Sequence, residues 1–154
     1  SALEIQRLCL QGPWKRDYVV FEAAVTLSNM GKAYLEREKF DLAACVYEEC
    51  VMLQTTILRK NHELVLKSLG SLAFSRAKNG DLKKGIKVFY GILRSQINAN
   101  GEDSVEALET MRMLGVLHMR AYEKEDAVNC LTRVLAWQKQ SLDPSHPAIR
   151  NTRV

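Results

Sequence analysis

Histidine and cysteine side chains are among the groups in this sequence that could act as a general base, a nucleophile or a metal ligand. The chain contains three histidines and four cysteines: His62, His118, His146, Cys9, Cys45, Cys50 and Cys130. No two cysteines form a CxxC pair, and the sequence has no HExxH motif, no glycine-rich phosphate loop and no nucleophile elbow. We therefore expect no catalytic residue, no metal site, no cofactor and no small-molecule substrate.

The cysteine spacing suggests no disulfide framework, because Cys45 and Cys50 fall on different sides of one predicted helix. Reduced cysteines used as small apolar side chains fit a reducing compartment such as the cytoplasm. The chain begins without a methionine and without the layout of a signal peptide, so we expect the natural start to lie before Ser1.

Charge and hydropathy argue against two further classes of partner. The net charge is only +4, and acidic residues are interspersed among the basic ones. Nucleic-acid binding needs basic residues gathered in a stripe or cluster, and a transmembrane helix needs about 18 or more consecutive apolar residues. We expect neither nucleic-acid binding nor membrane insertion.

An internal repeat predicts the elements that position these residues. Three segments that begin at Ala24, Leu66 and Leu108 align without a gap, each offset from the one before by 42 residues. With columns counted from those residues, small side chains occupy the eighth column (Gly31, Ala73, Gly115) and the twentieth (Ala43, Gly85, Ala127). Large apolar side chains occupy the fourth (Leu27, Leu69, Met111), the seventh (Met30, Leu72, Leu114) and the twenty-fourth (Tyr47, Phe89, Leu131).

These columns predict two antiparallel helices in each repeat, because the early columns share one face of a first helix and the late ones share one face of a second. The small residues let the two helices approach closely where they cross. The predicted helices are 22–37 and 41–57, 63–78 and 82–98, and 105–120 and 124–141. His118 is then a packed ring on a helix, whereas His62 and His146 lie in connectors and are expected to form hydrogen bonds at helix starts.

The columns resemble the tetratricopeptide repeat (TPR), whose pattern has a small residue at column 8, Ala at column 20 and an aromatic residue at column 24. A period of 42 is similar to the kinesin-light-chain type, and its connectors are similar to the segment Leu142-Asp143-Pro144-Ser145-His146-Pro147. The resemblance implies an all-α fold, a right-handed superhelical solenoid of antiparallel helix hairpins. Its parts form a single array over 1–154: a partial preceding repeat and connector (1–22), repeats at 23–64, 65–106 and 107–147, and the start of a further helix (148–154).

The resemblance also implies a protein-binding surface on the concave wall that the first helices form. We expect a non-catalytic scaffold or adaptor, and a protein partner, either a peptide segment or a larger subunit, that carries acidic and apolar side chains. The predicted contact residues are Asn29, Lys32, Lys67, Phe74, Lys78, Arg112, Met113, Val116 and Arg120. The Asn29 amide can donate to and accept from a bound peptide backbone, although bonding to a neighbouring turn explains it equally well.

An alternative function follows from the two ends of the sequence. Residues 1–11 align with the second helix of an earlier repeat, and 148–154 begin another first helix, so the chain enters and leaves in mid-hairpin without a polar cap. The protein would then be a structural subunit or a fragment of a large assembly, held by its convex face or its ends with the groove unused.

Overall fold

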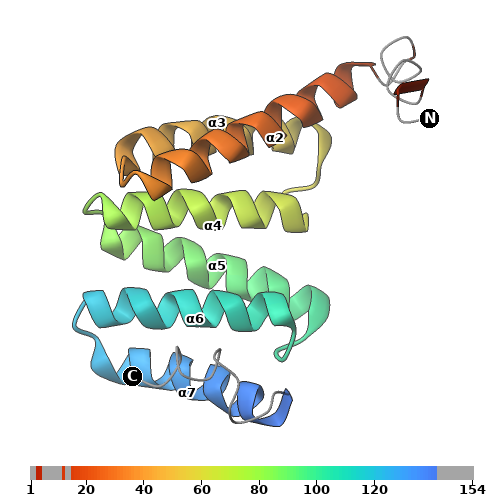
Figure 1. The fold of residues 1–154 in the computed structure, drawn as a ribbon. Helices are drawn as coiled ribbons and strands as arrows, with labels where there is room; N and C mark the ends of the chain where they lie inside the picture. The colour runs from red at the N-terminus through yellow and green to blue at the C-terminus, as the bar shows by residue number, and fades with distance from the viewer. Residues whose placement is uncertain (1–2, 5–11, 13–14, 142–154) are drawn as a thin grey trace. The chain divides into compact units, whose positions relative to one another are not determined.

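The structure, a computed structural model, describes residues 3–4, 12 and 15–141. Six α-helices lie in this part of the chain (Figure 1): α2 (Lys15–Glu36), α3 (Phe40–Ile57), α4 (Glu63–Lys78), α5 (Leu82–Asn100), α6 (Val105–Arg120) and α7 (Lys124–Ser141). The predicted all-α fold of consecutive helical hairpins is confirmed. Cys9, His146, the connector 142–147 and the two terminal segments 1–2 and 148–154 fall outside the described residues, as does most of 1–14.

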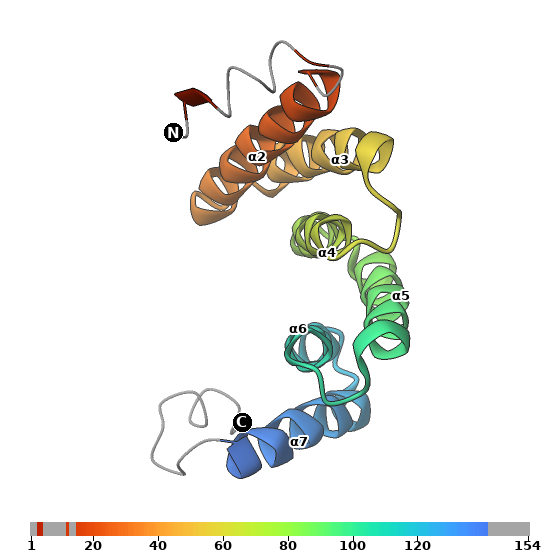
Figure 2. The same ribbon diagram turned by 90° about the vertical axis from the view of Figure 1, so that its right-hand side faces the viewer.

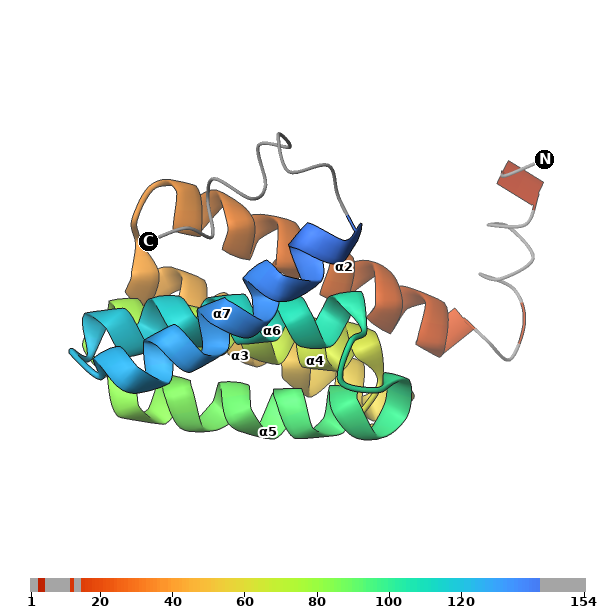
Figure 3. The ribbon, with the colours of Figure 1, turned by 90° about the horizontal axis from the view of Figure 1, so that it is seen from below.

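The helices group into two compact units. Unit 1 extends to Asn79 and holds α2, α3 and α4, and unit 2 begins at Gly80 and holds α5, α6 and α7. In unit 1 the middle helix α3 packs against both α2 and α4, and Figure 2 shows α4 nearly end on beside α3. In unit 2 the middle helix α6 packs against α5 and α7, and Figure 3 shows α7 crossing α6 obliquely. The repeat boundaries and the superhelical handedness stay predictions.

One predicted helix boundary is wrong. Five helices begin and end within two residues of the predicted positions, but α2 begins at Lys15 instead of residue 22. The stretch from Lys15 to Phe21 contains no Gly or Pro, and Asp17 in its first turn interacts favourably with the helix dipole. The repeat alignment set the predicted start, whereas the residues upstream of the repeat already favour a helix.

The small columns mark the places where paired helices meet. Ala43 is fully buried, and the glycines at 31, 85 and 115 are buried as well. A Cβ atom added at Gly31 would lie 2.5 Å from Cζ of Tyr47, and one added at Gly115 would lie 2.7 Å from Cδ2 of Leu131. The side chain at column 24 of the second helix therefore rests directly on the glycine at column 8 of the first, as the small-residue pattern predicts.

One core prediction fails at Met30, whose side chain is 43% exposed although its column is buried in the later repeats. Leu72, at the same column of α4, is buried in a cluster with Ala43 and Tyr47 of the preceding helix α3. The seventh column is thus covered by the second helix of the repeat before it. The helix predicted within residues 1–11, which would cover Met30 in the same way, lies mostly outside the described residues.

The residues that cap the starts of α4 and α6 lie one period apart in the two connectors. His62 precedes α4, and its Nδ1 accepts a hydrogen bond from the Leu64 backbone N–H at 3.1 Å. Ser104 precedes α6 one period later, and its hydroxyl oxygen accepts from the Ala107 N–H at 3.3 Å. Both bonds satisfy an N–H that the helix start leaves unpaired. The predicted helix-start role of His62 is confirmed.

None of the helices in the described ranges combines the length and the apolar character needed to cross a membrane.

The contact between Gly31 and Tyr47 generates a stability prediction. Gly31→Ala should lower the free energy of unfolding by roughly 1–2 kcal/mol, because the added methyl collides with a ring that is only 1% exposed. Gly91→Ala is the matched control, since it lies inside α5 with nothing within 4 Å of an added Cβ. That control should gain about 0.5–1 kcal/mol from better helix propensity. Urea melts of both variants check this, and equal stabilisation by the two would contradict the close-contact explanation.

Candidate functional site

A pocket of about 210 Å³ opens in unit 1 where α2 and α4 flank α3, and we call it the unit 1 pocket. Its α2 residues recur every three or four positions, as do its α4 residues, so each helix presents one face to the pocket. The lining residues are Phe21, Ala24, Val25, Ser28, Asn29 and Lys32 from α2, Gln54 from α3, and Leu64, Lys67, Ser68 and Ser71 from α4.

Three of the nine predicted contact residues, Asn29, Lys32 and Lys67, line this pocket together. Several other lining residues were missed by the sequence analysis, among them Phe21 and Gln54. Phe21 lies one residue before the predicted start of its helix, and Gln54 lies on a second helix, whereas the predicted wall used first helices alone. A signal for Gln54 was present, because glutamine recurs at its column in every repeat, as Gln96 and Gln138.

The charge of the unit 1 pocket has one sign. Lys32 and Lys67 are both exposed, and neither Asp nor Glu occurs among the described residues that line the pocket. Beside these lysines lie three partly exposed apolar side chains, namely Phe21 and Val25, each 41% exposed, and Leu64, 39% exposed. The pocket therefore offers positive charge and apolar surface next to each other, which suits an occupant with acidic and apolar groups.

A buried hydrogen-bond chain lies beneath the pocket. The Cys50 thiol donates to the Ala24 carbonyl oxygen at 3.3 Å, and its sulfur lies 3.7 Å from the Ser68 hydroxyl oxygen. Cys50 is fully buried, and this burial raises the pKa of its thiol despite the opposing hydrogen bond from Ser68. Burial also raises the pKa of the Tyr47 hydroxyl, although Ser71 acts in the opposite direction. This polar chain joins all three helices of unit 1.

Two further predicted contacts, Phe74 and Lys78, pair with each other at the end of α4. The Lys78 ammonium lies 5.4 Å from the centre of the Phe74 ring and 6.0 Å from that of the Phe40 ring. Both distances are within the range of a cation–π interaction. Lys78 is half-buried and its charge already faces aromatic rings of unit 1.

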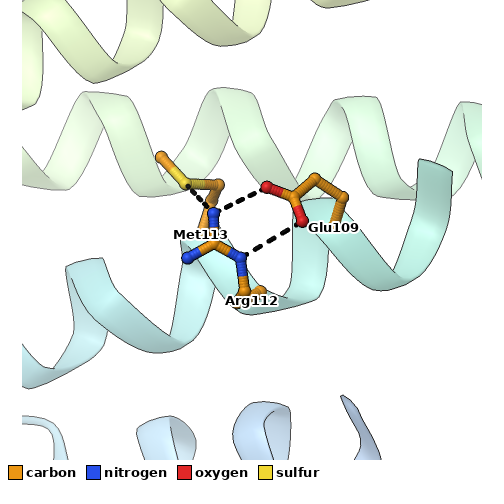
Figure 4. Close-up of polar contacts among 3 residues, drawn as sticks. All are labelled: Glu109, Arg112 and Met113. Carbon is orange, nitrogen blue, oxygen red and sulfur yellow. Dashed lines mark hydrogen bonds and ion pairs between the residues drawn. The ribbon is translucent and has the colours of Figure 1, made fainter. Parts of the chain in front are cut away.

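The remaining predicted contacts lie on α6 in unit 2. Arg112 forms two bonds to Glu109 one turn earlier, from Nη2 to Oε1 at 2.6 Å and from Nε to Oε2 at 3.1 Å (Figure 4). Nη2 also lies 3.7 Å from the Met113 sulfur. Glu109 raises the pKa of Arg112 and compensates its charge locally, which the helical spacing of three residues permits. Val116 is half-buried, and Arg120 is exposed at the end of the helix.

His118 is a buried, hydrogen-bonded ring, 4% exposed, in agreement with its predicted packing role. Its Nε2 lies 2.8 Å from the Tyr90 hydroxyl oxygen, and its Nδ1 lies 2.5 Å from Oε2 of Glu123. The ligand atoms of His118, Glu123 and Asp126 lie within 4.8 Å of one another. They could hold a cation only by giving up the bond between His118 and Glu123, and Lys83 and Lys87 line the same hollow. We therefore assign His118 a packing role.

Several solved structures of kinesin-light-chain-like repeat proteins are similar to this fold. A kinesin-light-chain-type protein of Podosopora anserina with nearly identical TPR-like repeats matches with a TM-score of 0.76 and 20% identity over 82% of this chain and 60% of that one. A single-residue variant of that protein gives a TM-score of 0.74 and 21% identity. BtubC (BKLC) from P. vanneervenii gives a TM-score of 0.73 and 19% identity over 90% of this chain and 59% of that one.

The predicted resemblance is thus confirmed at the level of the fold, over most of the chain. The chain spans about 60% of the length of the two Podosopora structures. No protein-family model and no curated protein matches the sequence.

The environment of the cysteines predicts their reactivity. Cys45 is exposed and should react quickly with a maleimide, whereas buried Cys50 should react only when α3 opens. Because folding raises the Cys50 pKa, the stability that this thiol contributes is complete below its ordinary value of 9.0 and is lost as the pH rises through the higher folded value. Mass spectrometry of timed labelling at pH 7.5 measures both rates. Comparable rates at the two sites would show that the burial of Cys50 is wrong.

Proposed function

We propose that the protein is a non-catalytic scaffold or adaptor that binds a segment of a partner protein in the unit 1 pocket. The observation that supports this most directly is the juxtaposition of Lys32 and Lys67 with the exposed apolar side chains of Phe21, Val25 and Leu64. The TPR-like fold adds support, since stacked helical hairpins present extended binding surfaces.

The two kinds of contact have different effects on binding. An exposed ion pair contributes only about 0.2–1 kcal/mol, so the two lysines mainly select acidic segments and accelerate their association. Burial of Phe21, Val25 and Leu64 contributes roughly 25 cal/mol for each Å² of apolar surface removed from water. We therefore expect apolar side chains of the partner to set the affinity and its acidic side chains to set the specificity.

The polar groups of the pocket also support binding in preference to catalysis. Two of its serine hydroxyls are engaged, since Ser71 Oγ donates to the Lys67 carbonyl oxygen at 3.3 Å and Ser68 Oγ contacts the Cys50 sulfur. A serine becomes an effective nucleophile only when a neighbouring base accepts its proton. Among the described lining residues there is neither a histidine nor a carboxylate to act as that base.

Charge reversal in the unit 1 pocket tests the proposal. Short peptides selected from a random library on the whole chain should be enriched in Asp or Glu together with apolar residues. The double variant Lys32→Glu/Lys67→Glu should weaken the best peptide about tenfold or more, since two attractions become repulsions. The matched control, Lys60→Glu/Lys139→Glu, makes the same change in net charge at two exposed sites outside the pocket and should bind within about twofold of the wild type.

Salt separates this function from the alternative role as a structural subunit. Affinity that depends on exposed lysines should fall between low salt and about 0.5 M salt, where the screening length is only a few Å. Apolar contacts through the convex face or the ends should persist at the same salt concentration. If neither the lysine reversals nor salt changes the affinity, the pocket is not the binding site and the structural role is preferred.

A further inference from the structure

The repeated glutamine column differs between the two units in its hydrogen bonding. In unit 2 the Gln96 Oε1 atom accepts a hydrogen bond of 2.6 Å from the Thr110 hydroxyl, so its acceptor is satisfied inside the protein. In unit 1 the equivalent residues are Gln54 and Ser68, one period earlier in each case. Gln54 is only 8% exposed, and its Oε1 is buried without a hydrogen-bond partner among the described residues.

The side chain at column 27 accounts for this difference. The residue there is Ile92 in the second repeat and Val134 in the third, whereas it is Cys50 in the first. The Cys50 thiol donates to the Ala24 carbonyl oxygen, which leaves its sulfur as the acceptor for the Ser68 hydroxyl. The single proton of the Ser68 hydroxyl is then committed to Cys50 and is unavailable to Gln54.

A buried acceptor without a donor is unfavourable by about 1–3 kcal/mol, so it favours any occupant that brings an N–H group. Gln54 lines the unit 1 pocket between Asn29 on α2 and Lys67 on α4. The terminal torsion of a glutamine side chain is soft, so a rotation about it turns Oε1 toward the pocket. The backbone of an extended peptide carries an N–H group at nearly every residue, whatever its sequence.

We propose that Gln54 determines binding in the unit 1 pocket by accepting a hydrogen bond from a backbone N–H of an extended peptide segment. The Gln54 amide oxygen stays free to accept this bond because the Ser68 hydroxyl is hydrogen-bonded to the Cys50 sulfur. This inference rests on the proposed function, because it names the residue that reads the backbone of the bound segment. Lys32 and Lys67 then select the acidic side chains of the same segment.

The first test replaces Gln54 by Met, which keeps the length of the side chain and removes the acceptor. Gln54→Met should weaken the selected peptide about fivefold, the effect of one ordinary hydrogen bond, without loss of thermal stability. Gln138→Met is the matched control, because Gln138 occupies the same column, has the same 8% exposure and lies outside the pocket. Its Oε1 likewise has no partner among the described residues. The control should bind as the wild type does. Equal binding by both variants would overturn the inference.

A second variant leaves Gln54 in place and supplies a donor for its amide oxygen. Cys50→Val introduces the residue of the third repeat and releases the Ser68 hydroxyl, which can then donate to Gln54 as Thr110 donates to Gln96. Peptide affinity should fall as much as in Gln54→Met, although every lining residue of the pocket is unchanged. Wild-type affinity in a folded Cys50→Val protein would show that Cys50 does not control Gln54.

Backbone methylation of the peptide identifies the donor directly. A set of peptides is made, each methylated at a single backbone nitrogen. At one position, methylation should weaken binding to the wild type, whereas Gln54→Met should bind the methylated and unmethylated peptides equally. If no position shows this coupling while Lys32→Glu/Lys67→Glu still weakens binding, the inference fails and the proposed function stands. If the lysine reversals also have no effect, both fail.

Discussion

The Tyr47 ring resting on Gly31 sets the separation of α2 and α3, and the remaining geometry of unit 1 depends on it. The ring is 1% exposed and also packs with Ala43 and with Leu72 of α4, so one side chain joins all three helices. Because the ring takes the place where a Cβ of residue 31 would lie, the helices can pack closely only if that residue is glycine. This contact keeps α2 and α4 on either side of α3, and the pocket lies where the two flanking helices face each other. In unit 2, Leu131 fills the equivalent place against Gly115.

On this repeated framework, single changes of side chain produce chemically different sites. Column 27 is filled by Ile92, Val134 or Cys50, and all three side chains are buried. Only the cysteine brings a donor and a polarizable acceptor into the core of its repeat, where it redirects the Ser68 hydroxyl. The TPR-like packing tolerates this exchange because the three side chains are of similar, modest size. The repeated architecture thus accommodates a local polar difference, which leaves the Gln54 acceptor without a donor among the described residues.

Local pairing decides which basic residues can contact a partner. The sequence places several lysines and arginines on first helices, but Arg112 is held by Glu109 and Lys78 faces the Phe74 and Phe40 rings. Lys32 and Lys67, on different helices of unit 1, lie on either side of one pocket that has apolar walls. The effective charge of the surface therefore depends on the neighbours of each residue, and a count of basic columns overstates it.

The sequence by itself determined the repeat, the fold class and the ends of most helices, because a period of 42 with small residues at two columns leaves one way to pack the hairpins. Helical periodicity put Asn29 and Lys32 on one side of the first helix, and the structure brings Lys67 of α4 to the same pocket; their role in binding stays a prediction. The early start of α2 was missed, because the repeat alignment set the predicted start near the first aligned column. The exposure of Met30 was missed, because its column does not tell whether a second helix covers it. Only the tertiary structure decided that Gln54 of a second helix reaches the pocket and that its acceptor is unpaired. Those properties depend on which of two acceptors, the Cys50 sulfur or the Gln54 amide oxygen, the Ser68 hydroxyl meets across packed helices. The sequence pattern does not encode those distances.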